Sequence, residues 1–405
     1  MVPIVSEVIQ NGAVAVADGK IAYVGPAENA PESDEVTEFS GTLMPGLINA
    51  HTHLCYSAFD EMFSGEKEFF EWVQEFAIRN PKMTDEQWAQ STQKGIDESV
   101  RHGVTAVADV VTSEAALPVL LGSDLAGVAY WEACFIDNKL WEEKRNAWRN
   151  VLTEARATNN SDIELGISPH TLYTLSTGTA KSLAEFARTF EIRLHPHLAE
   201  TEHEVLYVDR GAGPFAYLGR RFGLEFELVA QGGAGHSPTA EMEKVRWLGS
   251  DSHVAHGVHL DAEDRKLLAK HDTVVALCAR SNERLATGEA PVAAYRAEGN
   301  KVAIGTDSLA SAPNLDVAGE WLPLKRLALQ QGDPGAELDE WLVRAATVNG
   351  AEALGRNDIG RLVEGARADL AVFEVDGSAN PYTALVTGAA GNCKATVVCG
   401  NLIEH

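Results

Sequence analysis

The chain has 405 residues and a net charge of −26, from 33 basic and 59 acidic side chains. This acidic balance argues against binding to nucleic acid or to anionic membranes, both of which require basic patches. Hydrophobic residues make up 45% of the chain, enough for a large core, but no apolar run approaches the roughly 18 residues of a membrane span. Five scattered cysteines and an N-terminus without a signal peptide indicate a cytoplasmic protein.

Both ends of the chain are predicted to be rich in β-strand. Residues 14–25 (VAVADGKIAYVG) read as a hairpin with Asp18-Gly19 as its two-residue turn. Strand-like segments return after Ile359, and neither end is long enough to bury a core alone. We therefore expect residues 1–43 and 359–405 to pair into one small composite β-sandwich domain, with residues 44–358 as the second domain.

The middle of the chain alternates short apolar segments with helical stretches. Eight strands with intervening helices are the count of a (β/α)₈ barrel, so the predicted fold is α/β, a TIM-type barrel carrying the small composite domain. Residues 59–80 form an aromatic-rich insert after the first strand, which is either a helix packed on the core or a lid over the site. The eight strand candidates are residues 47–54, 105–111, 126–135, 163–172, 192–200, 253–260, 273–281 and 301–308.

Polar residues mark the ends of several predicted strands, where barrels of this type carry their chemistry. His51 and His53 end the first strand and point to the same side, because strand side chains alternate. His197 lies at the end of the fifth strand, His256 in the sixth, and Asp307 at the end of the eighth. Imidazoles and a carboxylate brought together in this way would form a mixed nitrogen and oxygen site for a borderline divalent ion.

Five motifs occur in an order that resembles the amidohydrolase superfamily, in its branch of nucleobase and nucleoside deaminases and triazine hydrolases. They are LMPGLINAHTH, HPHLAETEHE, VAHGVHL, IGTDSLAS and GRLVEGARADLAVF. The resemblance implies that His170, in ISPHTL, touches the substrate. It also implies one divalent metal ion, with Zn²⁺ expected and Fe²⁺ as the alternative. The implied metal ligands are His51, His53, His197 and Asp307, and the implied catalytic residues are Glu200, His256 and Asp307.

The same resemblance implies a division of labour in catalysis. A bound Zn²⁺ or Fe²⁺ makes hydroxide available near neutral pH by lowering the pKa of water towards about 7. Asp307 would take the proton of the attacking water, Glu200 would carry it to a ring nitrogen, and His256 would orient the hydroxide. Binuclear relatives carry a bridging lysine on the fourth strand, and IELGISPHTL has none, so we expect one metal ion.

Three further histidines leave alternatives open. His195 lies two residues before His197 and on the same face, where it could support a ligand, replace one, or simply be buried. His253 and His259 flank His256, and a slipped register would exchange their roles. We prefer His256 because AHGVHL matches the family motif.

Two segments indicate the substrate. CARSN (278–282) and HLAETEHEVLYVDRGAGPF (197–215) are similar to the aminodeoxyfutalosine deaminases of menaquinone biosynthesis. Arg280 would then bind the carboxylate of that substrate, or alternatively form a salt bridge at the barrel rim. Trp72 is expected either to stack on a purine or to pack in the core.

These observations favour a hydrolytic deaminase that acts on carbon–nitrogen bonds other than peptide bonds. Its expected small-molecule substrate is aminodeoxyfutalosine or another 6-aminopurine nucleoside. The alternatives are deamination of guanine, 8-oxoguanine or S-adenosylhomocysteine, hydrolysis of an s-triazine, and ring opening of an imidazolone-type cyclic amide. A non-catalytic barrel is disfavoured, since no expected ligand or catalytic residue is missing. The family resemblance also allows a homodimer.

Overall fold

The computed structural model describes residues 1–63, 68–159, 161–221 and 226–405. Its centre is a barrel of eight strands, which form two parallel four-stranded sheets in the orders β4-β5-β6-β7 and β8-β9-β10-β11. Each of the eight predicted strand segments overlaps one of these strands. Their bounds are β4 (Leu47–Thr52), β5 (Val104–Val111), β6 (Ala126–Glu132), β7 (Ile163–Ser168), β8 (His197–Leu198), β9 (His253–His256), β10 (Val274–Leu277) and β11 (Val302–Ile304).

Isolated bridges join the two sheets on both sides. Leu194 pairs with Ile167 of β7 and with Ser252 next to β9, and Thr52 of β4 pairs with Asp307 beyond β11. All eight residues of β5 are buried, as is typical of a parallel strand covered on both faces. The expected α/β fold with a TIM-type barrel is therefore confirmed.

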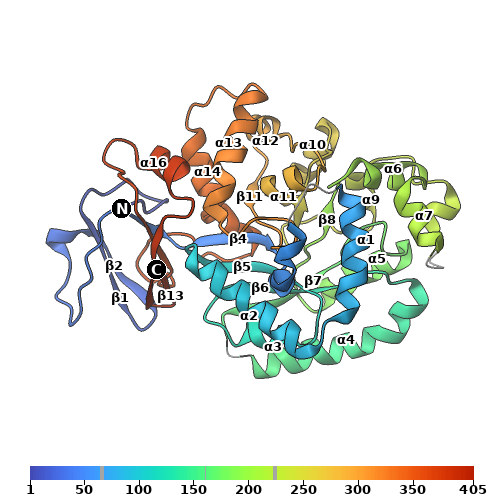
Figure 1. Ribbon diagram of the computed structural model, residues 1–405, viewed down its shortest axis with the longest axis horizontal. Helices are drawn as coiled ribbons and strands as arrows, with labels where there is room; N and C mark the ends of the chain where they lie inside the picture. Colours follow the sequence, from blue (N-terminus) through green and yellow to red (C-terminus); the bar gives the residue numbers. More distant parts are fainter. Residues whose placement is uncertain (64–67, 160, 222–225) are drawn as a thin grey trace.

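Helices cover the outside of the barrel (Figure 1). Their sequences carry the expected end signals. For example, Thr84 and Gln87 form a capping box at the start of α2. The helices before β8 are η1 (Ala27–Asn29), η2 (Leu54–Phe63), α1 (Phe69–Arg79), η3 (Asn80–Lys82), α2 (Asp85–Arg101), α3 (Ala116–Leu121), α4 (Asn138–Thr158) and α5 (Thr177–Thr189).

The second half of the chain carries mostly shorter helices, which connect the later barrel strands and lead to the C-terminal strands. They are α6 (Glu202–Arg210), α7 (Pro214–Arg221), α8 (Glu227–Gln231), α9 (Pro238–Lys244), α10 (Ala262–Lys270), α11 (Ala279–Arg284), α12 (Val292–Glu298), η4 (Val317–Glu320), α13 (Trp321–Gln330), α14 (Leu338–Ala345), α15 (Val348–Ala353) and α16 (Pro381–Gly388).

The two chain ends lie side by side at one end of the molecule (Figure 1). Asp18 and Gly19, with φ of 50° and 70°, form the predicted turn between β1 and β2. A second, antiparallel sheet has the order β14-β13-β12-β3, so one N-terminal strand joins three C-terminal strands. Separate domains divided at residues 43 and 359 stay a prediction. The strands are β1 (Gly12–Ala17), β2 (Lys20–Pro26), β3 (Thr42–Pro45), β12 (Leu370–Phe373), β13 (Cys393–Val398) and β14 (Asn401–Glu404).

The aromatic-rich insert 59–80 contains the end of η2 and all of α1, while its residues 64–67 lie outside the described part of the chain. Phe76 of α1 packs against Tyr56 and Phe59, with ring centroids 4.6 and 5.3 Å apart. Phe69 is buried, and the other aromatic residues of α1 are half-buried. In its described part, the insert is thus a helix packed on an aromatic cluster.

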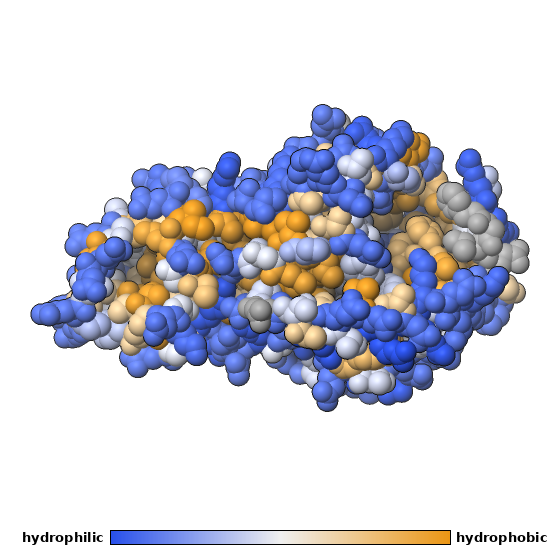
Figure 2. Space-filling model, turned by 90° about the horizontal axis from the view of Figure 1, so that it is seen from below, coloured by the Kyte–Doolittle hydropathy of each residue, from blue (hydrophilic) through white to orange (hydrophobic). Residues whose placement is uncertain are grey.

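One face of the molecule carries a hydrophobic band across its middle, bordered by hydrophilic residues (Figure 2). Exposed large hydrophobic side chains include Leu402 and Ile403 of β14. Within the described ranges, no helix has both the length and the apolar character that a membrane crossing requires.

Candidate active site

Four side chains converge at the C-terminal end of the barrel. His51 lies in β4 and His53 directly follows it, His197 lies in β8, and Asp307 follows β11. The Nε2 atoms of His51 and His53 each lie 3.7 Å from Oδ1 of Asp307. Nε2 of His197 lies 3.4 Å from Nε2 of His53. The structure therefore brings together the four residues expected to be metal ligands.

The hydrogen bonds behind His51 determine which of its ring nitrogens faces the cluster. Nδ1 of His195 lies 3.0 Å from the carbonyl oxygen of His253, so this nitrogen must be the donor. Nε2 of His195 then accepts from Nδ1 of His51, 2.8 Å away. Nε2 of His51 is left unprotonated and buried, without a hydrogen-bond partner in the described structure. A buried lone pair in this position fits a metal ion, and His195 lies behind the ligand.

The other histidines are also suited to metal binding. Nδ1 of His197 donates to the carbonyl oxygen of His170 at 3.2 Å, which leaves Nε2 free for a metal. Burial lowers the pKa of His197 to about 4. Burial and the neighbouring histidines hold the pKa values of His51 and His53 well below the usual range. Neutral imidazole is the form that binds metals, so the site is ready for one divalent ion.

Two serines orient the carboxylate of Asp307. The hydroxyl groups of Ser281 and Ser311 donate to Oδ2 at 2.6 and 2.8 Å. These bonds leave Oδ1 to face the histidines. Burial raises the pKa of Asp307, and the two hydroxyl donors act in the opposite direction. Such support fixes the direction in which a metal-binding carboxylate points.

Glu200 and His256 form the other side of the cluster. Oε1 of Glu200 lies 3.8 Å from Nδ1 of His256. Asn282 donates to the same Nδ1 at 3.2 Å, which places the ring proton of His256 on Nε2. One polar atom each of Glu200, His256 and Asp307 lie within 4.8 Å of one another. Burial, together with Asp307 and Glu204, holds the pKa of Glu200 well above its usual range.

The turn that carries Glu200 is held by a buried carboxylate. Glu204, in the first turn of α6, accepts from the backbone N–H groups of Ala199 and Glu200 at 2.9 and 3.2 Å. Ala199 has a φ of 47°, and His256 and Asp307 also have positive φ values of 72° and 61°. Such conformations are rare outside glycine and persist where the surrounding structure enforces them. The site is therefore rigidly built.

A close approach of two strands also shapes the site. A Cβ atom at Gly305 would lie 2.6 Å from Cβ of His51, so only glycine allows β11 to approach β4 here. The backbone N–H groups of Thr306 and Asp307 then donate to the carbonyl oxygen of His51 at 3.1 and 3.0 Å. This contact aligns Asp307 with the histidines of β4.

The histidines left open in the sequence now have defined surroundings. Nε2 of His253 bonds to the carbonyl oxygen of Ala50 at 2.9 Å, beneath the cluster. Nε2 of His259 bonds to the carbonyl oxygen of Thr287 at 2.5 Å, outside it. Of the three histidines in this segment, His256 is therefore the one that faces Glu200.

His170 lies beside the candidate metal ligands. Its ring centroid is 4.9 Å from that of His197, and its Nδ1 is bonded to Thr174 at 3.1 Å. Trp72 approaches from α1 and donates from Nε1 to the carbonyl oxygen of Ala310 at 2.9 Å. Phe76 stacks on Trp72 with ring centroids 5.4 Å apart, and the ring of Phe69 lies 6.1 Å from it, so Trp72 is part of an aromatic cluster.

Arg280 points away from the candidate metal ligands and forms a separate hydrogen-bond network. Its Nε donates to Oε1 of Glu320 at 2.5 Å, and its Nη atoms donate to Asn314 and to the carbonyl oxygen of Asp316 at 2.6 and 2.7 Å. The Glu320 side chain is fully buried and that of Arg280 is 13% exposed. The guanidinium is thus paired as in the salt-bridge alternative, and binding of a substrate carboxylate by Arg280 stays a prediction.

Replacing Arg280 by methionine is expected to lower the free energy of unfolding by about 3–5 kcal/mol, because the Glu320 carboxylate would stay buried without its partner. Urea unfolding measures this change. The double variant R280M/E320L should lose less stability than R280M alone. If the R280M protein has normal stability but binds carboxylate-bearing substrates poorly, Arg280 binds the substrate carboxylate and the structural role is contradicted.

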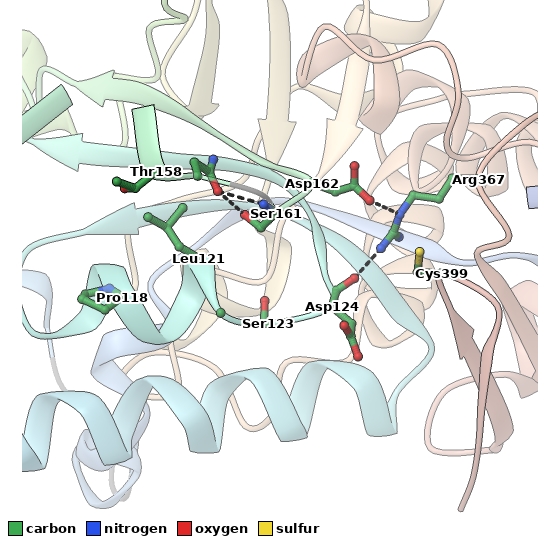
Figure 3. A pocket seen from close by; sticks show the side chains of 11 residues that line it. Pro118, Leu121, Ser123, Asp124, Thr158, Ser161, Asp162, Arg367 and Cys399 are labelled. Atoms are coloured by element: carbon green, nitrogen blue, oxygen red, sulfur yellow. Dashed lines mark hydrogen bonds and ion pairs between the residues drawn. The ribbon is translucent and has the colours of Figure 1, made fainter. Parts of the chain in front are cut away.

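A separate cavity of about 610 Å³ lies at the opposite end of the barrel, where β6 and β7 begin (Figure 3). Arg367 reaches into it and pairs with Asp162 at 2.8 Å and with the carbonyl oxygen of Asp124. In the described structure, none of the groups suited to metal binding lies there. This end of a barrel usually serves stability, so the catalytic site is assigned to the other end.

Several residues of the site carried no clear signal in the sequence. Glu204, Ser281, Ser311 and Asn282 support the residues that were predicted. Ser281 and Asn282 belong to the CARSN segment, of which only Arg280 was predicted to be a site residue. Tyr56 stacks on His53 with ring centroids 4.9 Å apart. Nothing in the sequence distinguishes this tyrosine from the apolar residues that follow His-x-His.

Fold and site together define a metal-dependent hydrolase with one divalent metal site. The family model described as "Amidohydrolase family" matches residues 42–403, and the chain belongs to this family. A 5-methylthioadenosine/S-adenosylhomocysteine deaminase of Halobacterium salinarum is 32% identical over 376 residues, which cover 88% of this chain and 78% of the relative. The expected class, a hydrolase of carbon–nitrogen bonds, is confirmed.

Solved structures show the same fold. An adenosine deaminase from Xanthomonas campestris with bound zinc has a TM-score of 0.83 at 24% identity, over 99% of this chain and 90% of the other. The Helicobacter pylori aminofutalosine deaminase in complex with methylthio-coformycin also has a TM-score of 0.83, at 22% identity, over 99% and 97% of the two chains.

Proposed function

We propose that the protein is a metal-dependent deaminase that replaces the exocyclic amine of a 6-aminopurine nucleoside with oxygen and releases ammonia. The observation that carries this proposal is the convergence of three imidazoles and Asp307 beside the buried carboxylate of Glu200. The Halobacterium relative supports the substrate class, since both substrates in its name are adenine nucleosides modified at the 5′ position.

The site residues fit a metal ion, because Nε2 of His51 is a buried lone pair that the protein leaves without a partner. We propose His51, His53, His197 and Asp307 as its ligands. Zn²⁺ suits this mixture of nitrogen and oxygen donors, and the zinc-bound structure with the same fold supports that choice. A divalent ion bound here supplies Lewis-acid activation of water near neutral pH.

Side chains of the site carry out the proposed proton transfers. Asp307, with Oδ1 turned towards the histidines, accepts a proton from the attacking water. Glu200 has a raised pKa, so its protonated form donates to a ring nitrogen of the base. The Nε2–H group of His256 donates to the oxygen that becomes negatively charged. The C–O bond forms, Asp307 returns its proton to the amine, and the C–N bond breaks, so that the amine leaves as ammonia. The proton that remains on the new oxygen passes to Glu200, which restores both carboxyl groups.

The substrate within this class is proposed from the surroundings of the site. Aminodeoxyfutalosine carries an aryl carboxylate, and Arg280, its expected partner, is paired with Glu320. The relationship to a 5-methylthioadenosine/S-adenosylhomocysteine deaminase favours nucleosides with a 5′-thioether. His170 and Trp72 are proposed to contact the base. We also propose that the enzyme works in the cytoplasm.

Ammonia release by the zinc-loaded protein tests the proposal. The panel comprises adenosine, 5′-methylthioadenosine, S-adenosylhomocysteine, aminodeoxyfutalosine, guanine and an aminotriazine. We expect a kcat/KM above about 10⁴ M⁻¹ s⁻¹ for at least one adenine nucleoside, which is the lower end for natural enzyme substrates. Release from guanine or the triazine alone would overturn the substrate class. Ring opening of a cyclic amide without ammonia would overturn deamination itself.

A further inference from the structure

Glu132, the last residue of β6, holds a carboxylate for which the mechanism above has no use. Side chains on a strand alternate, so Glu132 faces the same side as Tyr130, whose ring lies inside the barrel 5.0 Å from that of His195. Glu132 is the C-terminal residue of the strand and therefore lies at the catalytic end. One of its carboxylate oxygens lies within 4.8 Å of ring nitrogens of His170 and His197.

Among the described residues, no hydrogen bond or ion pair engages the Glu132 carboxylate, although the side chain is only partly exposed. Removing a carboxylate from water without a partner costs free energy. The buried Glu204 illustrates the contrast, because its two oxygens accept from two backbone N–H groups. A free carboxylate in a catalytic site is suited to accept hydrogen bonds from a ligand.

The chemistry of the substrate limits which ligand groups can donate. In a 6-aminopurine nucleoside, the ring nitrogens N1, N3 and N7 are acceptors, and N9 carries the sugar. The exocyclic amine is a donor, but it is consumed at the reacting carbon. The remaining donors are the hydroxyl groups of the ribose, and two neighbouring hydroxyls match the two oxygens of a carboxylate.

The arrangement of the site places Glu132 on the correct side for this contact. Glu200, His256 and Asp307 lie together: Glu200 follows β8, His256 ends β9, and Asp307 follows β11. Glu132 and His170 lie on the side of β6 and β7. Among the described residues, His197 lies close both to this pair and to the candidate ligands His51 and His53. A base whose C6 edge faces Glu200 therefore directs its sugar away from that group.

We propose that the Glu132 carboxylate binds the 2′- and 3′-hydroxyls of the substrate ribose and thereby selects ribonucleosides. The inference rests on the proposed nucleoside deaminase function. Glu132 is a specificity-determining residue in this assignment and takes no part in proton transfer.

The test compares adenosine with 2′,3′-dideoxyadenosine, which differ only in the proposed contact. For the wild-type enzyme, we expect kcat/KM to favour adenosine by roughly 10–100-fold, as is typical of the loss of two hydrogen bonds. In E132Q and E132A this preference should fall to about threefold or less, as an order-of-magnitude expectation from the same loss. E164Q is the matched control, since Glu164 is an exposed carboxylate on the neighbouring strand β7 and should keep the wild-type preference.

Each other outcome has a distinct meaning. A wild-type preference that E132Q and E132A retain would overturn the role of Glu132 and leave deamination intact. Equal losses for both nucleosides would place Glu132 against the base instead and also overturn the inference. If the variants do not fold, inhibition of the wild-type enzyme by inosine and by 2′,3′-dideoxyinosine decides, and equal inhibition would contradict the contact. A wild-type protein that deaminates no adenine nucleoside would overturn the proposed function first.

Discussion

Replacing Glu200 by glutamine is expected to lower kcat by about 10²–10⁴-fold, the usual contribution of a positioned general acid or base. Glutamine keeps the size and polarity of the side chain but carries no transferable proton. Metal content should stay near one equivalent, because Glu200 is not among the proposed ligands. Ammonia release under saturating substrate and metal analysis by mass spectrometry measure the two quantities.

A matched control lies two residues away. Glu202 is exposed in the first turn of α6, so E202Q changes the same chemical group without touching the site. Its kcat should equal that of the wild-type enzyme. Normal turnover by E200Q would show that another group moves the proton, whereas loss of the metal in E200Q would show that Glu200 acts as a ligand.

Replacing His53 by alanine is expected to have an effect of similar or larger size. The variant loses one of the three proposed imidazole ligands, so it should retain little metal after dialysis. Because metal-assisted hydrolysis depends on several kcal/mol of charge stabilisation, kcat/KM should fall by at least about 10³-fold. Metal content after dialysis and activity at a fixed Zn²⁺ concentration measure both changes.

His203 provides the control for this second substitution. It is exposed on α6, and H203A should retain the metal and the activity of the wild-type protein. A stoichiometric, tightly bound metal in H53A would mean that the ion is held elsewhere. Full activity of dialysed, metal-free wild-type protein would contradict the metal-dependent mechanism as a whole.

The barrel could be predicted because its signals are local. Each strand is a short apolar segment bounded by turns, and eight such segments with helices between them have few alternative architectures. The grouping of His51, His53, His197 and Asp307 followed from the rule that parallel strands bring their carboxyl ends to one face. The structure does bring these side chains together, and their role as metal ligands stays a prediction.

Contacts between distant residues were beyond the sequence. The CARSN segment showed that polar residues follow β10, but it could not show which of them faces the site. In the structure, Ser281 turns to Asp307, whereas Arg280 turns to Glu320, forty residues further along the chain. Glu132 could not be predicted either, because a single carboxylate at the end of an apolar strand belongs to no recognisable motif.

The sheet shared by the two chain ends has a consequence for how the protein is made. Strand β3 pairs with β12, and the hydroxyl of Thr42 donates to the carbonyl oxygen of Val375, which is 333 residues away in the chain. A ribosome adds roughly 5–20 residues per second, so β3 waits on the order of tens of seconds for its partner. During that time its edge is open to unwanted pairing. We therefore expect slower translation to lower the yield of native enzyme, and a chaperone that covers the nascent N-terminal strand to raise it.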